Sequence, residues 1–236
     1  HTLSGVSFDY LTKLQEEGTY AIIYCLIEGA IRNLVYKPDS VLNLVYLAAG
    51  SPTIPEGGAE IVIENVTAGS PDESSTVSAG TNDGLFVIHA LNNNATVTFR
   101  NCTNYYNVDC SAYTGVFLSG YAYPSVDLVF DNCDNYGTFY GTSLGYLIGN
   151  SAHLAKSVTA SNCDNYGALY ASTDADFVCW GNDVYSGKYT GTDNTEGIIK
   201  TLEPVNVAVS TDPSTAEISI TSGLDSYSEF EITASG

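Results

Sequence analysis

The sequence predicts an all-β protein, a right-handed parallel β-helix (β-solenoid) of about five coils of about 30 residues with a small antiparallel β cap at the C-terminal end. Composition, a fixed-period repeat and short apolar runs bounded by turn residues support this. The 236 residues include no methionine and only 7 Lys and Arg, but 18 Tyr and 22 Gly. Such a composition is typical of strands joined by turns.

A six-residue sequence, NCDNYG, occurs at residues 132–137 and again at 162–167, and the related NCTNYY occupies 101–106. Aligned on the first Asn of each copy, IVIENV at 61–66 and the weaker match GAIRNL at 29–34 extend the series. The aligned residues are Asn33, Asn65, Asn101, Asn132 and Asn162, with steps of 32, 36, 31 and 30. Units this short cannot bury their own apolar faces, so they must stack on one another.

A second block follows each copy, an apolar run that closes on a small residue. It is found as FVIHA at 86–90, VFLSG at 116–120, YLIG at 146–149 and VCWG at 178–181, and residues 44–49 belong with it. Each unit therefore holds two or three short strands and no helical period. Stacked units made only of strands predict a parallel β-helix, in which neighbouring coils are hydrogen-bonded about 4.8 Å apart.

The repeated hexapeptide predicts one corner of the coil. Asn tolerates the left-handed backbone conformation that a sharp bend requires, and stacked Asn side chains can hydrogen-bond to one another along the axis. The following Cys is expected to turn inward, the Tyr to stack on its neighbours, and Gly137 and Gly167 to relieve the next turn. The predicted ladder consists of Asn65, Asn101, Asn132 and Asn162, of Cys102, Cys133 and Cys163, and of Tyr105, Tyr136 and Tyr166.

The six cysteines lack the spacing of a zinc site, because no C-x₂-C pair exists and none of the three His residues clusters with Cys in sequence. Vertical neighbours in the predicted column are close enough for a disulfide, but three thiols cannot all pair. Cys25 and Cys179 fall in apolar runs, whereas Cys110 falls in a loop. We expect buried free thiols, with one or more disulfides or a metal site as the alternatives.

The chain divides into four predicted segments. Residues 1–28 form an N-terminal cap and the first strands, with the one short helix near 11–18, and residues 29–184 form the β-helix repeats. Residues 185–203 are expected to be a turn-rich linker, because the hexapeptide does not return. Residues 204–236 carry three alternating apolar and polar runs, which predict an antiparallel β cap or the opening strands of a β-sandwich.

The formal net charge of −20 repels phosphate backbones and anionic lipids, so we expect no nucleic-acid partner. Charged residues and a proline interrupt the most apolar region, residues 21–47, which predicts no direct membrane insertion. Because the chain starts at His1 without an initiator Met, we expect a processed, extracellular or cell-surface protein whose signal peptide has been removed. Asn-x-Ser/Thr sequences make Asn65, Asn94 and also Asn101 candidate glycosylation sites.

Candidate catalytic groups are limited to carboxylates near turns, with no Lys, Arg or His expected in register beside them. These carboxylates are Asp131, Asp134, Asp164, Asp174 and Asp176. We expect them to solvate coil edges and assign no catalytic residue, metal ligand or cofactor, although residues 81–84 and 192–197 could bind Ca²⁺ weakly. Tyrosines predicted in loops could stack on sugar rings or form a protein contact surface, namely Tyr121, Tyr123, Tyr140, Tyr170, Tyr185 and Tyr189.

With its NC-x-NYG hexapeptide followed by an apolar block ending in Gly, the chain resembles the GLUG-like β-helical repeats over about residues 30–182. It departs from their usual double glycine, having LSG, LIG and CWG instead. The resemblance implies a β-helical stalk, adhesin or flanking module of bacterial and protist surface or secreted proteins, and it carries no catalytic residues.

The function expected from these observations is structural or adhesive. The chain would serve as a rigid surface module, as a subunit that assembles into a homo-oligomer or filament through its coil ends, or as a face that binds a carbohydrate or host-surface ligand. The alternative is a carbohydrate-active β-helix enzyme, either a polysaccharide lyase or a glycoside hydrolase.

Overall fold

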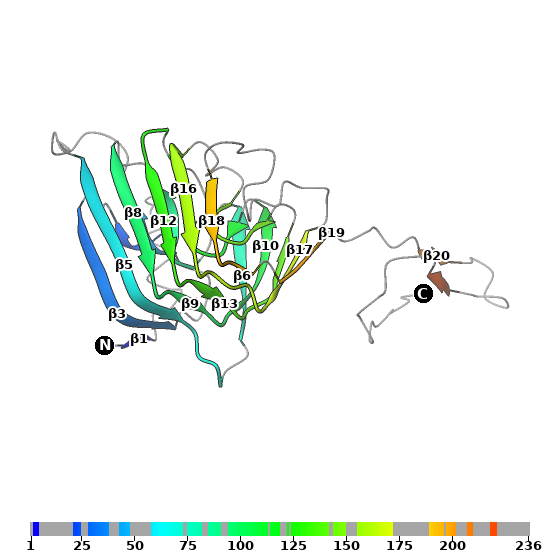
Figure 1. Ribbon diagram of the computed structural model, residues 1–236. Helices are drawn as coiled ribbons and strands as arrows, with labels where there is room; N and C mark the ends of the chain where they lie inside the picture. The colour runs from blue at the N-terminus through cyan, green and yellow to red at the C-terminus, as the bar shows by residue number, and fades with distance from the viewer. Residues whose placement is uncertain are drawn as a thin grey trace.

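The protein is described here by a computed structural model. It describes residues 2–4, 21–24, 28–37, 43–47, 58–72, 75–81, 85–90, 94–112, 114–118, 122, 124–141, 144–149, 155–171, 189–195, 197–201, 207–209 and 218–220. All the regular elements in these residues are β-strands, and all except the last two, at 207–209 and 218–220, stack in parallel as a β-solenoid (Figure 1). The predicted fold class is thereby confirmed.

The first sheet of the solenoid carries one strand from each successive coil. Its order is β1 (Thr2–Ser4), β3 (Gly29–Lys37), β5 (Ala59–Ala68), β8 (Ala95–Arg100), β12 (Asp127–Asp131), β16 (Ser157–Ser161) and β18 (Tyr189–Thr192). Every neighbouring pair is parallel, and the short strands β9 (Thr103–Asn104) and β13 (Asp134–Asn135) continue the sheet beyond the corner. Figure 1 shows these strands side by side in chain order.

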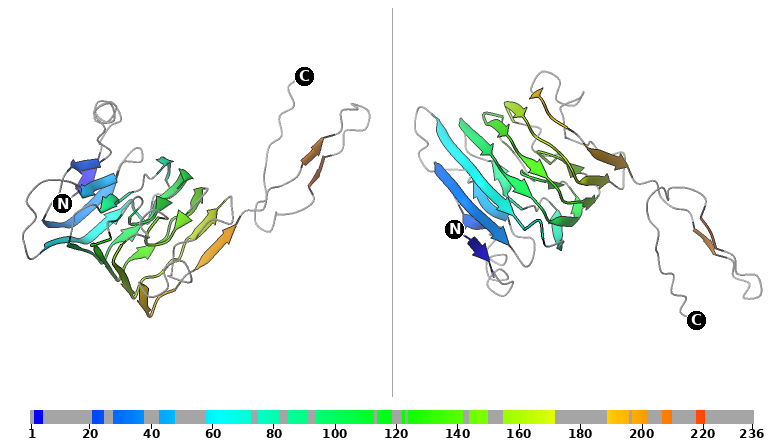
Figure 2. Two further views of the ribbon diagram at one scale, coloured as in Figure 1. Left: turned by 90° about the horizontal axis from the view of Figure 1, so that it is seen from above. Right: turned by 60° about the horizontal axis from the view of Figure 1, so that its bottom comes forward.

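Two further faces complete each coil (Figure 2). The second sheet has the order β6 (Thr76–Thr81), β10 (Asn107–Ala112), β14 (Phe139–Gly141), β17 (Ala168–Ala171) and β19 (Ile198–Thr201). The third face contains β2 (Ala21–Tyr24), β4 (Asn43–Leu47), β7 (Val87–Ala90), β11 (Thr114–Gly115) and β15 (Leu144–Gly145). Isolated parallel bridges from Val87 to Leu118 and from Leu118 to Ile148 continue this face from coil to coil.

Three consecutive coils, beginning at β5, β8 and β12, are described on all three faces, against the prediction of about five coils. The first sheet extends beyond these three coils on both sides, through β3 toward the N-terminal end and through β16 and β18 toward the C-terminal end. The alternation of apolar and polar residues explains why each strand has one buried face, since successive side chains point to opposite sides.

The interior is built from columns of apolar side chains, one from each coil. One column consists of Ile61, Val97, Leu128 and Val158, and another of Val77, Val108, Phe139 and Leu169, all 5% exposed or less. The rings of Phe99 and Phe130 stack with centroids 4.8 Å apart. Burying one such side chain stabilises the fold by about 1.5–3 kcal/mol, so each coil depends on the coil beside it.

The predicted linker at residues 185–203 is wrong as a boundary, because it contains β18 and β19. The first of these strands pairs in parallel with β16 and the second with β17, so this segment forms part of another coil. The hexapeptide is absent there, but Asp193 adopts the left-handed conformation in its place, with φ 52°. Asp shares with Asn the short polar side chain that tolerates this region.

Toward the C-terminal end, β20 (Val207–Val209) and β21 (Ile218–Ile220) pair antiparallel, as predicted for this part of the chain. Figures 1 and 2 show this pair beyond the β19 end of the solenoid. The third run of the predicted cap, 229–234, and the predicted helix near 11–18 lie outside the described residues.

Candidate functional site

The corner between the first and second sheets is the candidate site, and we call residues 101–106, 132–137 and 162–167 the corner. Its geometry begins with backbone conformation. The first Asn of each unit has a positive φ: 55° at Asn33, 53° at Asn65, 50° at Asn101, 53° at Asn132 and 52° at Asn162. The prediction that Asn provides a left-handed bend is confirmed at all five aligned positions.

The side chains of these residues form an outer asparagine ladder. Each Nδ2 donates to the Oδ1 of the preceding coil, from Asn65 to Asn33 at 3.0 Å, from Asn101 to Asn65 at 3.0 Å and from Asn132 to Asn101 at 2.9 Å. The predicted ladder is confirmed for these steps. Because the side chains are exposed, water competes for each bond and the net stabilisation is modest.

A second, inner asparagine ladder was not predicted. It consists of the second Asn of each hexapeptide, Asn104, Asn135 and Asn165, which are at most 1% exposed. Asn104 Nδ2 donates to Asn135 Oδ1 at 2.8 Å, and Asn135 Nδ2 donates to Asn165 Oδ1 at 2.8 Å. The repetition of this Asn at the fourth position of every copy is the signal that could have revealed it.

Two of the inner residues, Asn104 and Asn135, also hold the turn that follows them. Asn135 Nδ2 donates to the Gly137 carbonyl at 2.8 Å, and the Gly137 N–H donates back to Asn135 Oδ1 at 3.2 Å. Asn104 makes the same pair of bonds with Tyr106, at 2.9 Å and 3.1 Å. These buried amides satisfy backbone groups that would otherwise lack partners, which makes the inner ladder a larger contributor to stability than the outer one.

Glycine at the last position of the hexapeptide is required by a close approach of backbones. A Cβ atom at Gly137 would overlap the carbonyl oxygen of Tyr106, and one at Gly167 would overlap the carbonyl oxygen of Gly137. The predicted role of these two glycines in the turn thus has a steric basis, since the backbone of the preceding coil occupies the space that a side chain would need.

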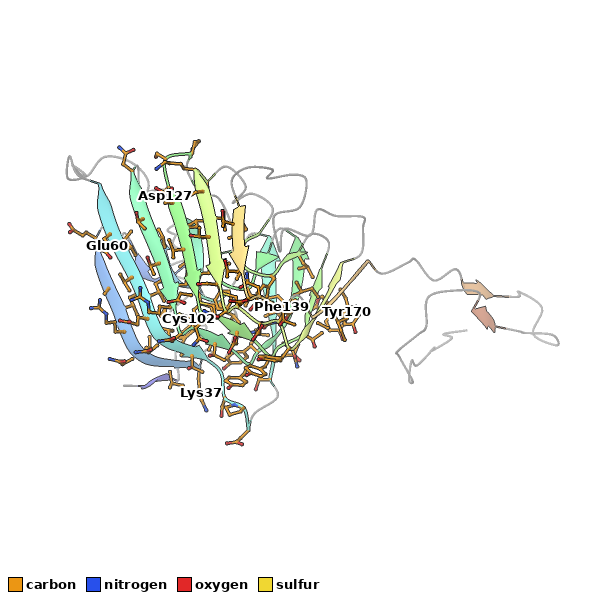
Figure 3. All side chains as sticks on the ribbon, viewed as in Figure 1. Lys37, Glu60, Cys102, Asp127, Phe139 and Tyr170 are labelled. Carbon is orange, nitrogen blue, oxygen red and sulfur yellow. The ribbon has the colours of Figure 1, made fainter. Side chains whose placement is uncertain are left out.

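The cysteine column points inward, as predicted. Cys102, Cys133 and Cys163 are free thiols with 0% exposure, and Figure 3 shows Cys102 at the corner. Their Sγ atoms donate to the carbonyls of Ile63 at 3.3 Å, Asp131 at 3.6 Å and Ser161 at 3.3 Å. Burial raises the pKa of Cys133 well above its ordinary value, so this thiol stays protonated at neutral pH.

The tyrosine column lies on the outside of the same corner. Tyr105 and Tyr136 stack with ring centroids 5.0 Å apart, and Tyr136 and Tyr166 with centroids 4.8 Å apart. The predicted offset stacking is confirmed. Tyr136 is 45% and Tyr166 57% exposed, and within the column Tyr136 is stacked on both faces and Tyr166 on one.

A second tyrosine pair was predicted in loops but lies on strands. Tyr140 belongs to β14 and Tyr170 to β17, and their rings stack with centroids 5.3 Å apart. Figure 3 shows Tyr170 on the second sheet. The in-register pairing of these strands places the two rings over one another. Each ring therefore covers one face of the other, and that face is not open to stacking on a sugar ring.

Carboxylates flank the tyrosine column. Asp134 and Asp164 occupy the same position of adjacent hexapeptides, and the Asp164 N–H donates to Asp134 Oδ1 at 3.3 Å. Burial raises the pKa of Asp134. The Tyr166 hydroxyl donates to Asp164 Oδ2 at 3.0 Å, and this hydrogen bond raises the pKa of Tyr166. The corner therefore places a phenol and a proton-accepting carboxylate in direct contact.

The expectation that no basic residue lies in register with the acidic ones is wrong for Asp131. Arg100 Nε lies 3.4 Å from Asp131 Oδ2, and Arg100 Nη1 lies 3.4 Å from Glu64 Oε1. Arg32 Nε, one coil earlier, lies 2.7 Å from Glu64 Oε2. All four side chains immediately precede an Asn of the outer ladder, so register alone places them in a row of alternating charge, the charge ladder.

A further ion pair lies at the start of β12 and β16. Lys156 Nζ lies 2.8 Å from Asp127 Oδ2, and Ser157 Oγ donates to the same carboxylate. The hydrogen bond from Lys156 lowers the pKa of Asp127. Figure 3 shows Asp127 where β12 begins, away from the corner.

The candidate glycosylation sites differ in what their side chains do. Asn65 and Asn101 each use Nδ2 in the outer ladder. Asn94 is exposed and has a φ of 54°. Glycosylation at any of the three stays a prediction, with Asn94 the position at which a glycan would disturb the fewest described contacts.

Several predicted residues lie outside the described part of the chain. These are Cys25, Cys179, Asp174, Asp176, Tyr121, Tyr123 and Tyr185, together with the side chains of Cys110 and Tyr189. Of the two stretches considered for Ca²⁺, residues 82–84 of the first and residue 196 of the second are not described. The second stretch contains Asp193, with its φ of 52°.

Within the described ranges, no three His, Cys, Asp or Glu side chains are grouped as metal ligands. The same ranges contain no helix long and apolar enough to cross a membrane. Comparison of the chain with family models, with curated proteins and with solved structures gives no match.

Proposed function

We propose that this chain is a rigid structural module of an extracellular or cell-surface protein. One observation carries the proposal: the polar and aromatic side chains of the corner and of the charge ladder contact their counterparts on adjacent coils. The outer and inner asparagine ladders, the charge ladder and the tyrosine column all run along the solenoid axis. The resemblance to GLUG-like repeats supports the same role.

Assembly through the coil ends is the form of this function that the sheets favour. β18 and β19 are the last strands of their sheets in the described part of the chain, and Thr190 to Asp193 and Ile198 are exposed. A strand at a sheet edge is a template for another strand. Because all pairings in the solenoid are parallel, contact between the two different ends of two copies would be heterologous and would build a filament.

The test is the particle mass and shape of the purified chain, measured by light scattering and negative-stain imaging with and without Ca²⁺. Rods that lengthen along one axis would support assembly through the ends, and growth only with Ca²⁺ would add a calcium site to the contact. A compact monomer near 25.0 kDa under both conditions would exclude self-assembly and leave the single-module form of the proposal.

Adhesion to a carbohydrate is the second candidate, favoured by the exposed rings of Tyr136 and Tyr166. Stacking within the column covers both faces of the Tyr136 ring but only one face of the Tyr166 ring, so a sugar at Tyr136 would be bound through the ring edge and hydroxyl more than by ring-face stacking. A glycan array probed with the wild-type chain and with the Tyr166→Ala variant tests this. Screening the same glycans for cleavage tests the alternative of a carbohydrate-active enzyme.

A further inference from the structure

The tyrosine column places three phenols in an arrangement suited to covalent joining. Its rings are nearly parallel, with interplanar angles of 14° and 17°, and successive rings come from coils that pair in register. Neighbouring Cα atoms are therefore about one strand spacing apart, roughly 4.8 Å. Because Tyr136 and Tyr166 are about half exposed, both rings can swing out of the stack until their edges meet.

Within the corner, the tyrosines are also the side chains most accessible to an oxidant. It contains no methionine, which together with exposed cysteine is a common target of oxidants in proteins. The three cysteines of the corner column have no exposed surface. The exposed side chains of the corner that can be oxidised are consequently its tyrosines.

A proton acceptor is in place at the most exposed ring. The Tyr166 hydroxyl donates to Asp164 Oδ2 at 3.0 Å. A phenol that loses an electron also loses its proton, and a carboxylate already hydrogen-bonded to the hydroxyl can accept that proton in the same step. Tyr166 is thus the ring of the column whose oxidation the structure assists.

We propose that the tyrosine column is a site of oxidative tyrosine coupling, at which a peroxidase using hydrogen peroxide joins Tyr136 to Tyr166 by a carbon–carbon bond. Each phenol loses one electron and one proton, and the two phenoxyl radicals form one bond between ring carbons next to the hydroxyls. The hydrogens on those carbons move to the oxygens, which restores both phenols. One hydrogen peroxide accepts the two electrons and two protons and yields two waters.

The product would covalently link two adjacent coils that are otherwise held by hydrogen bonds and packing. Like a disulfide, such a cross-link stabilises chiefly by restricting the unfolded chain. Because the link is a carbon–carbon bond and contains no sulfur, it would survive reducing conditions that break a disulfide.

The experiment treats the folded chain with horseradish peroxidase and hydrogen peroxide. It then identifies cross-linked peptides by mass spectrometry and follows the dityrosine fluorescence. We expect the peptide pair containing Tyr136 and Tyr166 to be the most abundant cross-link, in protein that still runs as a monomer on a denaturing gel. The same treatment in urea should abolish this preference, because the unfolded chain no longer aligns the rings.

Three conservative variants make the assignment specific. Tyr136→Phe keeps the ring but cannot form a phenoxyl radical, so the cross-links of the column should be lost while any Tyr140–Tyr170 cross-link persists. Tyr140→Phe is the matched control and should give the reverse result. Asp164→Asn, which keeps the shape but weakens the proton acceptor, should slow the coupling of Tyr136 to Tyr166 several-fold relative to that of Tyr140 to Tyr170.

The proposal is overturned if the folded chain yields oxidised but uncoupled Tyr136 and Tyr166, or if folded and urea-unfolded chains give the same cross-links. Cross-links only between molecules would also contradict it. Since the reaction is carried out on monomeric protein, its failure is distinguishable from failure of the assembly form of the proposed function.

Discussion

At the scale of single residues, the two asparagine ladders differ in what they contribute. The hydrogen bonds of the outer ladder are exposed, so water competes for them. The inner ladder is buried and satisfies backbone groups that water does not reach. The repeat period was sufficient to predict the outer Asn, the Cys and the Tyr columns. It did not reveal that the fourth residue of the hexapeptide is buried, because sequence alone does not show on which side of the bend a polar residue lies.

Substitution of Asn132 should separate backbone conformation from side-chain bonding. Asn132→Gly removes one ladder bond but keeps the left-handed φ available, whereas Asn132→Ala adds the strain of a Cβ in that region. We expect the Ala variant to be less stable than the Gly variant by about 1 kcal/mol, measured by urea unfolding. Equal stabilities would mean that the bend relaxes to another conformation.

Removing the inner Asn135 should cost more than removing an outer one. Asn135→Ala leaves both the N–H and the carbonyl of Gly137 without their side-chain partner and breaks the bonds to Asn104 and Asn165. The expected loss in unfolding free energy is about 3–5 kcal/mol, at roughly 1–3 kcal/mol for each buried group left unpaired.

Asn135→Asp is the matched variant, because it keeps the shape but replaces the two N–H donors by an acceptor and buries a charge. It should destabilise the chain at least as much as Asn135→Ala. A loss no larger than that of Asn132→Gly would show that water replaces the inner ladder.

The raised pKa of Cys133 predicts that stability falls in alkali. Above the ordinary thiol pKa of about 8.5, the unfolded chain loses this proton while the folded chain keeps it. The unfolded state then binds fewer protons, and the unfolding free energy falls as pH rises toward the folded-state pKa. In Cys133→Ala the decline between pH ~8.5 and ~10 should be shallower, as measured by urea unfolding at several pH values. An unchanged slope would mean that other groups cause the loss of stability in alkali.

At the scale of strands, the charge ladder shows how register turns sequence neighbours of the outer Asn into ion pairs. The hydrogen bond from Arg32 lowers the pKa of Glu64, consistent with a carboxylate shared between two guanidinium groups. Sequence separation was no obstacle to predicting this ladder: Arg100 and Asp131 are 31 residues apart, yet both immediately precede an aligned outer Asn, so the alignment of the units already places them in one column. The last coil was missed because Asp193 replaces the Asn that marks the others.

Reversing the charge at the centre of the charge ladder should give a salt-dependent loss of stability. Arg100→Glu places a third acidic residue between Glu64 and Asp131, which lie in the coils on either side. We expect a lower melting temperature at low ionic strength and a smaller difference at high salt, because exposed charges are screened. Arg32→Glu, which has one partner in the described ladder, should have the smaller effect, and equal effects would contradict this account.

At the scale of the whole molecule, stacking in register is the single property from which the rest follows. The fixed spacing of the repeats predicted stacking in register, because Asn, Cys and Tyr at equivalent positions can contact their counterparts only if successive coils superpose. The apolar block of each unit, predicted from the sequence, corresponds to the third face. The structure added the inner asparagine ladder and the extra strands β18 and β19. These depend on how the chain closes around its core, which the spacing of one corner does not specify.

Because the net charge is −20, the stability of the whole chain should depend on salt concentration. Acidic residues outnumber basic ones 27 to 7, so self-repulsion should outweigh the few ion pairs, and screening should favour the folded state. We expect the melting temperature of the wild-type chain to rise when sodium chloride is increased from about 10 mM to about 0.5 M, over which the Debye length shortens severalfold. A fall would show that the ion pairs dominate.

The stacked tyrosines also give the solenoid an optical signature. Rings about 5 Å apart with small interplanar angles couple their electronic transitions, and the sign of that coupling is set by the twist from one coil to the next. Near-ultraviolet circular dichroism should therefore report the alignment of adjacent coils directly. A chain that keeps its strands but slips by one residue between coils would lose this signal while its far-ultraviolet spectrum stayed the same.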